Sequence, residues 1–164
     1  MWHLQKPKRE MANKVERGIS IDRTPSEVWE YLTNPILMKE WMGEPEMNVE
    51  VITNWKIGNP ILIKGFHNGN FENKGTVLQF DFPRIIQYSH LSSTSRLPEN
   101  KENYSIITFM LTPKDRNTLL ELQIENFPTE SIHRHLNFYW QGTASILKTF
   151  IEQEKIKNAT QQKL

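Results

Sequence analysis

The stretch that decides the fold is HRHLNFYWQGTASILKTFIEQEK, residues 133–155. In and just before it, apolar side chains recur at the 3.6-residue spacing of an amphipathic helix, so one stripe of the helix is expected to face a core. That stripe consists of Ile132, Leu136, Tyr139, Trp140, Thr143, Ile146, Leu147, Phe150 and Ile151. Thr129, which follows Phe127-Pro128, is placed to cap the start of this helix.

Four small residues, Gly142-Thr143-Ala144-Ser145, interrupt the aromatic surface in the middle of the predicted helix. A glycine there costs roughly 1 kcal/mol relative to alanine. Two explanations stay open. The small residues leave space beside Trp140 for a ligand or a neighbouring ring. Otherwise they allow close helix–sheet packing, or Gly142 is exposed and has no role.

Two short helices are predicted upstream. Thr24 is a favourable N-cap, Pro25 suits the first helical position, and Glu27 completes a capping box. The apolar stripe of this first helix is Val28, Trp29 and Leu32. Asn34-Pro35 ends it, and residues 36–42 predict a second helix. One side of the second helix carries Leu37, Met38 and Trp41.

Alternating segments predict the strands. The first covers residues 15–21, and six more are expected near 46–52, 60–66, 73–82, 84–92, 103–112 and 118–126. In the segment 73–82 the residues assigned to one face are Thr76, Leu78, Phe80 and Phe82. In the last segment they are Thr118, Leu120, Leu122 and Ile124. Such alternation indicates an antiparallel sheet with one covered face, so we predict an α+β fold in two layers.

The composition of the chain excludes several classes of function. The chain has 164 residues, a formal net charge of +1 and no cysteine. These values favour one domain and exclude disulfides and thiolate catalysis. The charge balance does not favour nucleic-acid binding, and no apolar run approaches the ~20 residues of a membrane span. We expect a cytoplasmic protein with a basic leader (1–13), one domain (14–155) and a polar tail (156–164).

The ordered set of these segments resembles the helix-grip fold of the SRPBCC superfamily, which includes START domains and the birch-pollen allergen family. It is most similar to homologues of the heat-shock-protein-90 ATPase activator's C-terminal domain. The segments that carry the resemblance are TPSEVWEYLTNPILMKEW (24–41), GTVLQFDFPRIIQYSH (75–90), NTLLELQIENF (117–127) and YWQGTASILKTFIEQE (139–154). The resemblance implies a curved antiparallel sheet of six to seven strands around a long C-terminal helix.

The resemblance also implies a cavity between sheet and helix that accepts a hydrophobic small molecule. The residues expected to face it are Trp41, Phe80, Tyr88, His90, Ile107, Phe109, Leu136, Tyr139, Trp140 and Thr143. The alternative is that these side chains fill the core completely. An empty 300 Å³ void would cost about 7 kcal/mol at ~24 cal/mol per Å³, so a cavity must be packed, wet or occupied.

Histidines and carboxylates do not form a recognisable reactive motif. His133 and His135 are two residues apart, which is not the spacing of a helical metal pair. We therefore expect no metal site and no cofactor. Tyr88 and His90 share one strand face, where they could act as an acid–base pair or simply be hydrogen-bonded in the core.

We predict non-covalent binding of a lipid, an isoprenoid or an aromatic metabolite, rather than catalysis. One alternative is a chaperone-associated module of the heat-shock-protein-90 activator type, which would link the protein to the stress response. The other is a cyclase, dehydratase or hydrolase that works in the same pocket.

Overall fold

Seven antiparallel strands form one sheet in the order β1-β7-β6-β5-β4-β3-β2. The computed structural model describes residues 14–162 of the chain, so the expected leader lies outside the described residues. The elements are β1 (Lys14–Ile21), α1 (Pro25–Thr33), α2 (Pro35–Met42), β2 (Glu50–Thr53), β3 (Pro60–Phe66), β4 (Asn70–Asp81), β5 (Ile85–Ser92), β6 (Ser105–Lys114), β7 (Asn117–Glu125) and α3 (Glu130–Gln162). Three short 3-10 turns lie at Pro45–Met47, Ser93–Ser95 and Lys101–Asn103.

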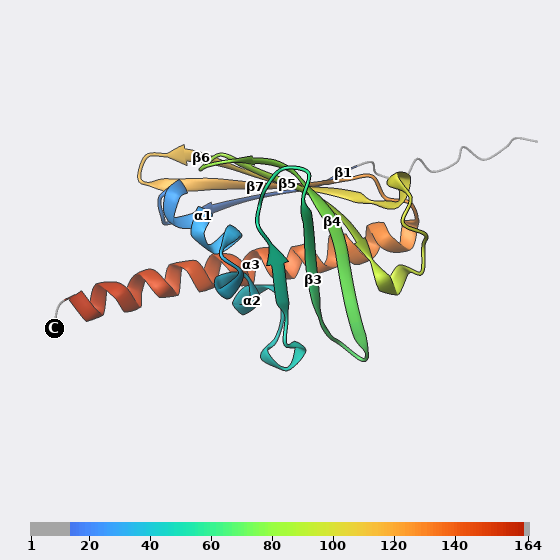
Figure 1. Cartoon of the computed structure of the whole chain (residues 1–164). Coiled ribbons are helices and arrows are strands. Elements are labelled where there is room, and N and C mark those ends of the chain that lie inside the picture. Colours follow the sequence, from blue (N-terminus) through green and yellow to red (C-terminus); the bar gives the residue numbers. More distant parts are fainter. Residues whose placement is uncertain (1–13, 163–164) are drawn as a thin grey trace, which may run out of the picture.

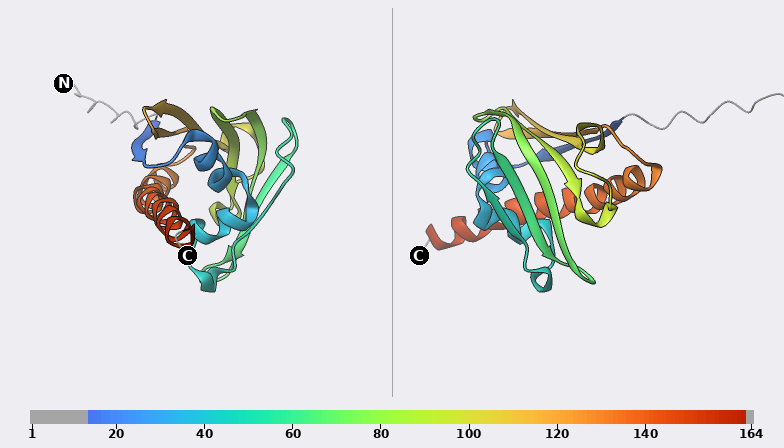
Figure 2. Two further views of the ribbon diagram at one scale, coloured as in Figure 1. Left: turned by 90° about the vertical axis from the view of Figure 1, so that its left-hand side faces the viewer. Right: turned by 45° about the vertical axis from the view of Figure 1, so that its right-hand side comes forward.

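The sheet curves around α3, and α1 and α2 lie between its two edge strands (Figures 1 and 2). This arrangement confirms the predicted helix-grip α+β fold. The sheet's inner face and one stripe of α3 contribute to a single apolar core, together with α1 and α2. Burial of this shared apolar surface is the dominant force that holds the layers together.

The capping box of α1 forms as predicted. The Glu27 N–H donates to the Thr24 hydroxyl oxygen at 3.4 Å, and the Thr24 N–H donates to the Glu27 carboxylate at 3.0 Å. Asn34 ends α1 and caps α2, because its side-chain oxygen accepts from Ile36 N–H at 3.0 Å. The two helices therefore meet at a fixed angle, which points Trp41 of α2 into the core.

Strands β6 and β7 follow the predicted alternation closely. The four residues assigned to the inner face of β7 are all buried: Thr118, Leu120, Leu122 and Ile124. They pair with β6 in an unbroken antiparallel register from Ile106↔Glu125 to Lys114↔Asn117. Because side chains alternate between faces, this register presents Ile107, Phe109 and Leu111 to the same core.

The face prediction for β4 was wrong for Leu78 but is confirmed for Phe80. The pairing register with β5 shifts between Val77 and Gln79, so Val77 is fully buried and Phe80 still packs on the core. Leu78 is 36% exposed and Phe82 is 59% exposed. An irregularity of this kind breaks period-two alternation at one residue, so Val77 before it faces the core and Phe80 after it does too.

Two element boundaries and one burial assignment are further differences between prediction and structure. The strand expected at 46–52 begins only at Glu50, because Pro45–Met47 forms a 3-10 turn and Asn48 has a left-handed φ of 47°. On α3, Ile146 was assigned to the core stripe but is 51% exposed. Helix α3 continues to Gln162, beyond the end expected near residue 155.

Helix α3 is fixed by polar contacts on two sides. The Lys148 ammonium donates to the Ser20 carbonyl at 2.5 Å, and Glu152 accepts from Asp22 N–H at 3.2 Å, which ties α3 to the end of β1. Nearer its start, the Tyr139 hydroxyl donates to the Met42 carbonyl at 2.6 Å, which ties α3 to α2. These contacts set where α3 stands relative to the sheet.

Candidate functional site

The predicted pocket residues come together between the sheet, α2 and α3. Eight of the ten belong to one apolar cluster or pack against it: Trp41, Phe80, Tyr88, Ile107, Phe109, Leu136, Tyr139 and Trp140. Ring contacts link them from helix to sheet. The Trp140 ring lies 6.2 Å from Trp41 and 5.6 Å from Phe109, and the Phe109 ring lies 6.4 Å from Tyr88.

One aromatic member of this cluster, Trp55, was missed by the sequence analysis. Its ring stacks on Phe80 at 5.3 Å and lies 6.3 Å from Tyr88. Trp55 sits in the β2–β3 connection with a positive φ of 57°, and its indole N–H donates to the Thr33 carbonyl at 2.7 Å. Trp55 lies outside any periodic segment, so the sequence does not indicate which face it occupies. The turn composition around it was the one feature from which its position could have been inferred.

Two polar groups on the inner face of β5 lack partners. Among the described residues, no hydrogen bond is formed by the Tyr88 hydroxyl or by either ring nitrogen of His90. Tyr88 is 2% exposed, and His90 is half-buried. Among the described side chains, the one fully buried N or O atom without a hydrogen bond is Arg23 Nη1, so the polar atoms of Tyr88 and His90 are not completely enclosed. They remain free to bind water or a ligand.

The electrostatics keep this region neutral. Burial, together with the charge of His135 on α3, lowers the pKa of His90 to about 4. Burial raises the pKa of Tyr139 to about 12, although its contact with the Thr143 hydroxyl acts in the other direction. Burial and the nearby Tyr139 also raise the pKa of Tyr88. At neutral pH the site therefore offers uncharged donors and acceptors within an aromatic shell.

The small residues of α3 divide between two faces. Thr143 and Ala144 are buried and face the core, whereas Ser145 is exposed. A Cβ placed on Gly142 would meet no atom within 4 Å. The exposed explanation for Gly142 is therefore confirmed, and any space beside Trp140 depends on Thr143 and Ala144 alone.

The remaining histidines and carboxylates form no reactive cluster. His133 packs edge-on against Phe127 at 4.6 Å. Among the side chains that the structure describes, no group of three His, Asp or Glu residues could hold a metal ion. In the same part of the chain, no helix combines the length and apolar character needed to cross a bilayer.

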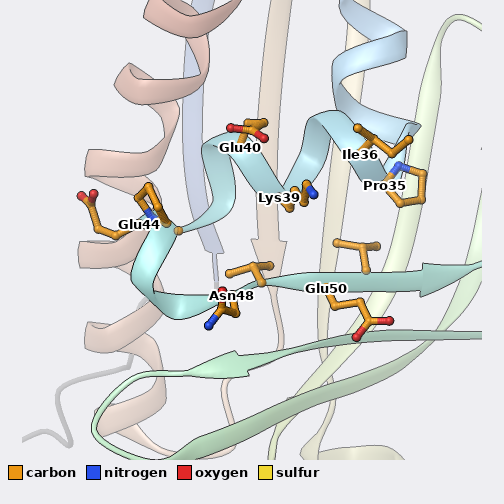
Figure 3. A pocket seen from close by; sticks show the side chains of 11 residues that line it. Pro35, Ile36, Lys39, Glu40, Glu44, Asn48 and Glu50 are labelled. Carbon is orange, nitrogen blue, oxygen red and sulfur yellow. The ribbon is translucent and has the colours of Figure 1, made fainter.

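A surface groove lies elsewhere, between α2 and β2, with a volume of about 540 Å³ (Figure 3). None of the ten predicted residues lines it. Its lining consists of Pro35, Ile36, Lys39, Glu40, Gly43, Glu44, Pro45, Asn48, Val49, Glu50 and Val51. The sequence analysis missed this groove because it depends on how a helix and an edge strand pack, which no periodic pattern encodes.

Comparison with models of known protein families assigns the chain to one of them. The model of the family described as "Activator of Hsp90 ATPase homolog 1-like protein" matches residues 22–152. The chain belongs to this family. The match confirms the resemblance that the four sequence segments carried, and with it the SRPBCC type of fold.

Solved structures agree with that assignment. A protein from Cytophaga hutchinsonii is 34% identical, with a TM-score of 0.72 over 88% of this chain and 97% of its own. A protein from Chromobacterium violaceum is 17% identical, with a TM-score of 0.72 over 87% and 99%. The Aha1 dimer from Colwellia psychrerythraea is 18% identical, with a TM-score of 0.66 over 85% and 96%. At such low identity the last two show the fold alone. A search of curated proteins gave no match.

Proposed function

We propose that this protein binds a hydrophobic small molecule, such as a lipid, an isoprenoid or an aromatic metabolite, between the sheet and α3. The observation that carries the proposal is the pair of unpartnered polar groups, Tyr88 and His90, inside an aromatic shell. Ligand sites typically combine apolar walls with a few placed polar groups. The ten residues gathered here have that composition.

Each part of the site has a separate task in this proposal. The rings of Trp41, Phe109 and Trp140 supply apolar contact area, and hence most of the affinity. Tyr88 and His90 orient the ligand by hydrogen bonds. Because His90 stays neutral at pH 7, the site suits an uncharged ligand group such as a carbonyl or hydroxyl.

Mass spectrometry of gently purified protein tests the proposal, first under native and then under denaturing conditions. A stoichiometric adduct that is lost on denaturation is the expected result. Thr143→Trp should abolish the adduct, because the indole fills the space beside Trp140. Ser145→Trp on the exposed face of α3 is the matched control and should keep the adduct.

A filled interior predicts different results. The wild type would then give a clean apo mass, and Thr143→Trp would lower the urea midpoint, since overpacking a full core costs ~1–3 kcal/mol. That pair of results would refute ligand binding at this position.

A second candidate function is an interaction module of the heat-shock-protein-90 activator type. The family match over residues 22–152 and the similarity to the Aha1 dimer favour it. Stimulation of the chaperone's ATPase by the purified protein is the test, and no stimulation at saturating protein would reject it. A cytoplasmic location, consistent with the absence of cysteine, forms part of both proposals.

A further inference from the structure

The outward side of α3 carries apolar side chains that the described part of one copy does not cover. Figure 2 shows α3 along the outside of the molecule, with the sheet and the two short helices on its other side. Phe138 is 80% exposed and Ile146 is 51% exposed on this outward side. The exposed residues between and beside them are Gln141, Gly142, Ser145 and Thr149. We call these six residues the outer face of α3.

The outer face is uncharged, although the chain as a whole is rich in charge. Charged residues make up 24% of the sequence, but Lys148 is the one charged residue from 138 to 149. Its ammonium donates to the Ser20 carbonyl and to the Glu152 carboxylate, so it is held toward β1. The solvent-facing side of a surface helix normally carries charged and polar residues. An exposed apolar patch on an uncharged side is typical of a surface that another molecule covers.

Gly142 lies near the middle of the 33-residue helix and has no packing role inside one copy. A Cβ added to it would meet no atom within 4 Å, so no neighbouring element of the described chain requires a glycine there. Glycine is less favourable than alanine inside a helix, because its backbone loses more conformational freedom on folding. A glycine does allow a second backbone to approach closely. Gly142 is therefore suited to the crossing point of two helices.

The apolar side chains are placed symmetrically about Gly142. Phe138 lies four residues before it and Ile146 four residues after it, which is ~6 Å along the helix axis in each direction. Two copies of α3 that cross antiparallel at Gly142 would therefore place Phe138 of each copy beside Ile146 of the other. Reciprocal contacts of this kind define a twofold, isologous dimer. The outer face is thus complementary to a second copy of itself.

The exposed apolar area fits a weak dimer. With ~200 Å² for a fully exposed side chain of this size, Phe138 and Ile146 offer about 260 Å² per copy, or about 520 Å² in two copies. Specific interfaces bury at least about 1,000–1,200 Å² in total. The small and polar residues of the outer face have to supply the rest, so the interface lies at the low end of this range. Such a dimer dissociates on dilution.

We propose that two copies of this chain associate through the outer faces of α3, antiparallel and crossing at Gly142. Phe138 and Ile146 supply the apolar contacts, and Gly142 lets the two helices approach closely. The interior site lies on the opposite side of α3, where Leu136 and Trp140 are buried. The proposal is therefore independent of what the interior site binds.

Sedimentation equilibrium over a range of protein concentrations tests the association. The mean mass should rise from 19.4 kDa toward twice that value as the concentration increases. Phe138→Ser/Ile146→Ser should raise the dimer Kd about tenfold or more, because it removes the central apolar contacts. The matched control, Ile57→Ser/Phe66→Ser, removes side chains that are 65% and 52% exposed elsewhere and should leave the Kd unchanged. A monomeric mass at millimolar concentration, or equal effects of the two double variants, would overturn the proposal.

Single cysteines test the geometry of the crossing, because the chain has no cysteine of its own. Under air oxidation Gly142→Cys should give a disulfide-linked dimer, since an antiparallel crossing brings the two Cα atoms within the ~7 Å limit of a disulfide. Thr149→Cys should not, because its two copies would lie ~20 Å apart along the axis. Equal cross-linking at both positions would refute the antiparallel crossing. Binding of monomeric protein to phosphatidylcholine vesicles through Phe138 and Ile146 would overturn the dimer in favour of a membrane surface.

Discussion

Replacement of His90 tests whether the interior site keeps its polar groups neutral. His90 lies two residues after Tyr88 on β5, and in the described region the one charge that acts on its pKa is that of His135 on α3. We expect His90→Phe to remove a destabilisation that develops when the pH falls. The ring size is nearly conserved, so packing changes little.

The sign and size of the effect come from the lowered pKa. In the unfolded chain a histidine titrates near 6.5, whereas in the folded protein the pKa of His90 is about 4. Between these values the unfolded state binds more protons, so the contribution of His90 to wild-type stability is fully present above pH 6.5 and is lost progressively as the pH falls from 6.5 to about 4. A shift of this size corresponds to about 2 kcal/mol at pH 5 and about 3 kcal/mol at pH 4.

Urea unfolding at pH 7, 6, 5 and 4 measures the effect. Carboxylates titrate in the same range, so the informative quantity is the difference in unfolding free energy between wild type and His90→Phe at each pH. This difference should shift toward the variant by about 2 kcal/mol between pH 7 and pH 5. His67→Phe, in the exposed β3–β4 turn, is the matched control and should follow the wild type.

His135→Gln provides a second check, because it removes the cation that acts on His90. The pH dependence should become shallower, since only burial then lowers the pKa of His90. A constant difference between wild type and His90→Phe across the pH range would refute the assignment of His90 as a desolvated, neutral imidazole.

Three further predictions concern stability and are checked by urea unfolding. Trp140→Ala should lower the free energy of unfolding by ~3–5 kcal/mol, because the indole joins α3 to the core rings. Phe138 lies on the same helix but is 80% exposed, so Phe138→Ala should change this free energy by less than ~0.5 kcal/mol. Equal effects of the two variants would contradict the assignment of Trp140 to the core. Gly142→Ala should raise the free energy of unfolding by ~0.5–1 kcal/mol, and a lower value would show that Gly142 is not in open space. Gly75→Ala should be severely destabilising, because the added Cβ would lie 1.6 Å from a carbonyl oxygen of β5. Thr24→Ala should cost ~1 kcal/mol through loss of the cap, and an unchanged midpoint would show that the capping box does not contribute to stability.

Local signals explain how much of the fold was predictable. The capping box at Thr24 and the break at Asn34 depend on neighbouring residues alone, so they could be predicted from the sequence. The alternation in β6 and β7 has no irregularity, so their buried faces were also predictable. The β4 faces were not, because the register shift at Val77 is decided by pairing with β5.

The candidate site was predictable only in part, for the same reason. Periodic residues such as Tyr88 and Trp140 carry a face signal, and the structure brings them together. Trp55 lies in a loop, where hydrophobic periodicity does not predict which side chains are buried. The groove beside β2 requires knowledge of which strand ends the sheet, and this is a property of the whole topology rather than of any segment.

The proximity of Trp41 and Trp140 provides an intrinsic optical probe of the fold. Their ring centroids are 6.2 Å apart, and the planes are inclined by 52°. Two indoles at that distance and inclination couple electronically and give a paired circular dichroism signal. One indole belongs to α2 and the other to α3, so the signal will change whenever these helices separate. Movement of the long helix away from its neighbours can therefore be followed in unlabelled protein.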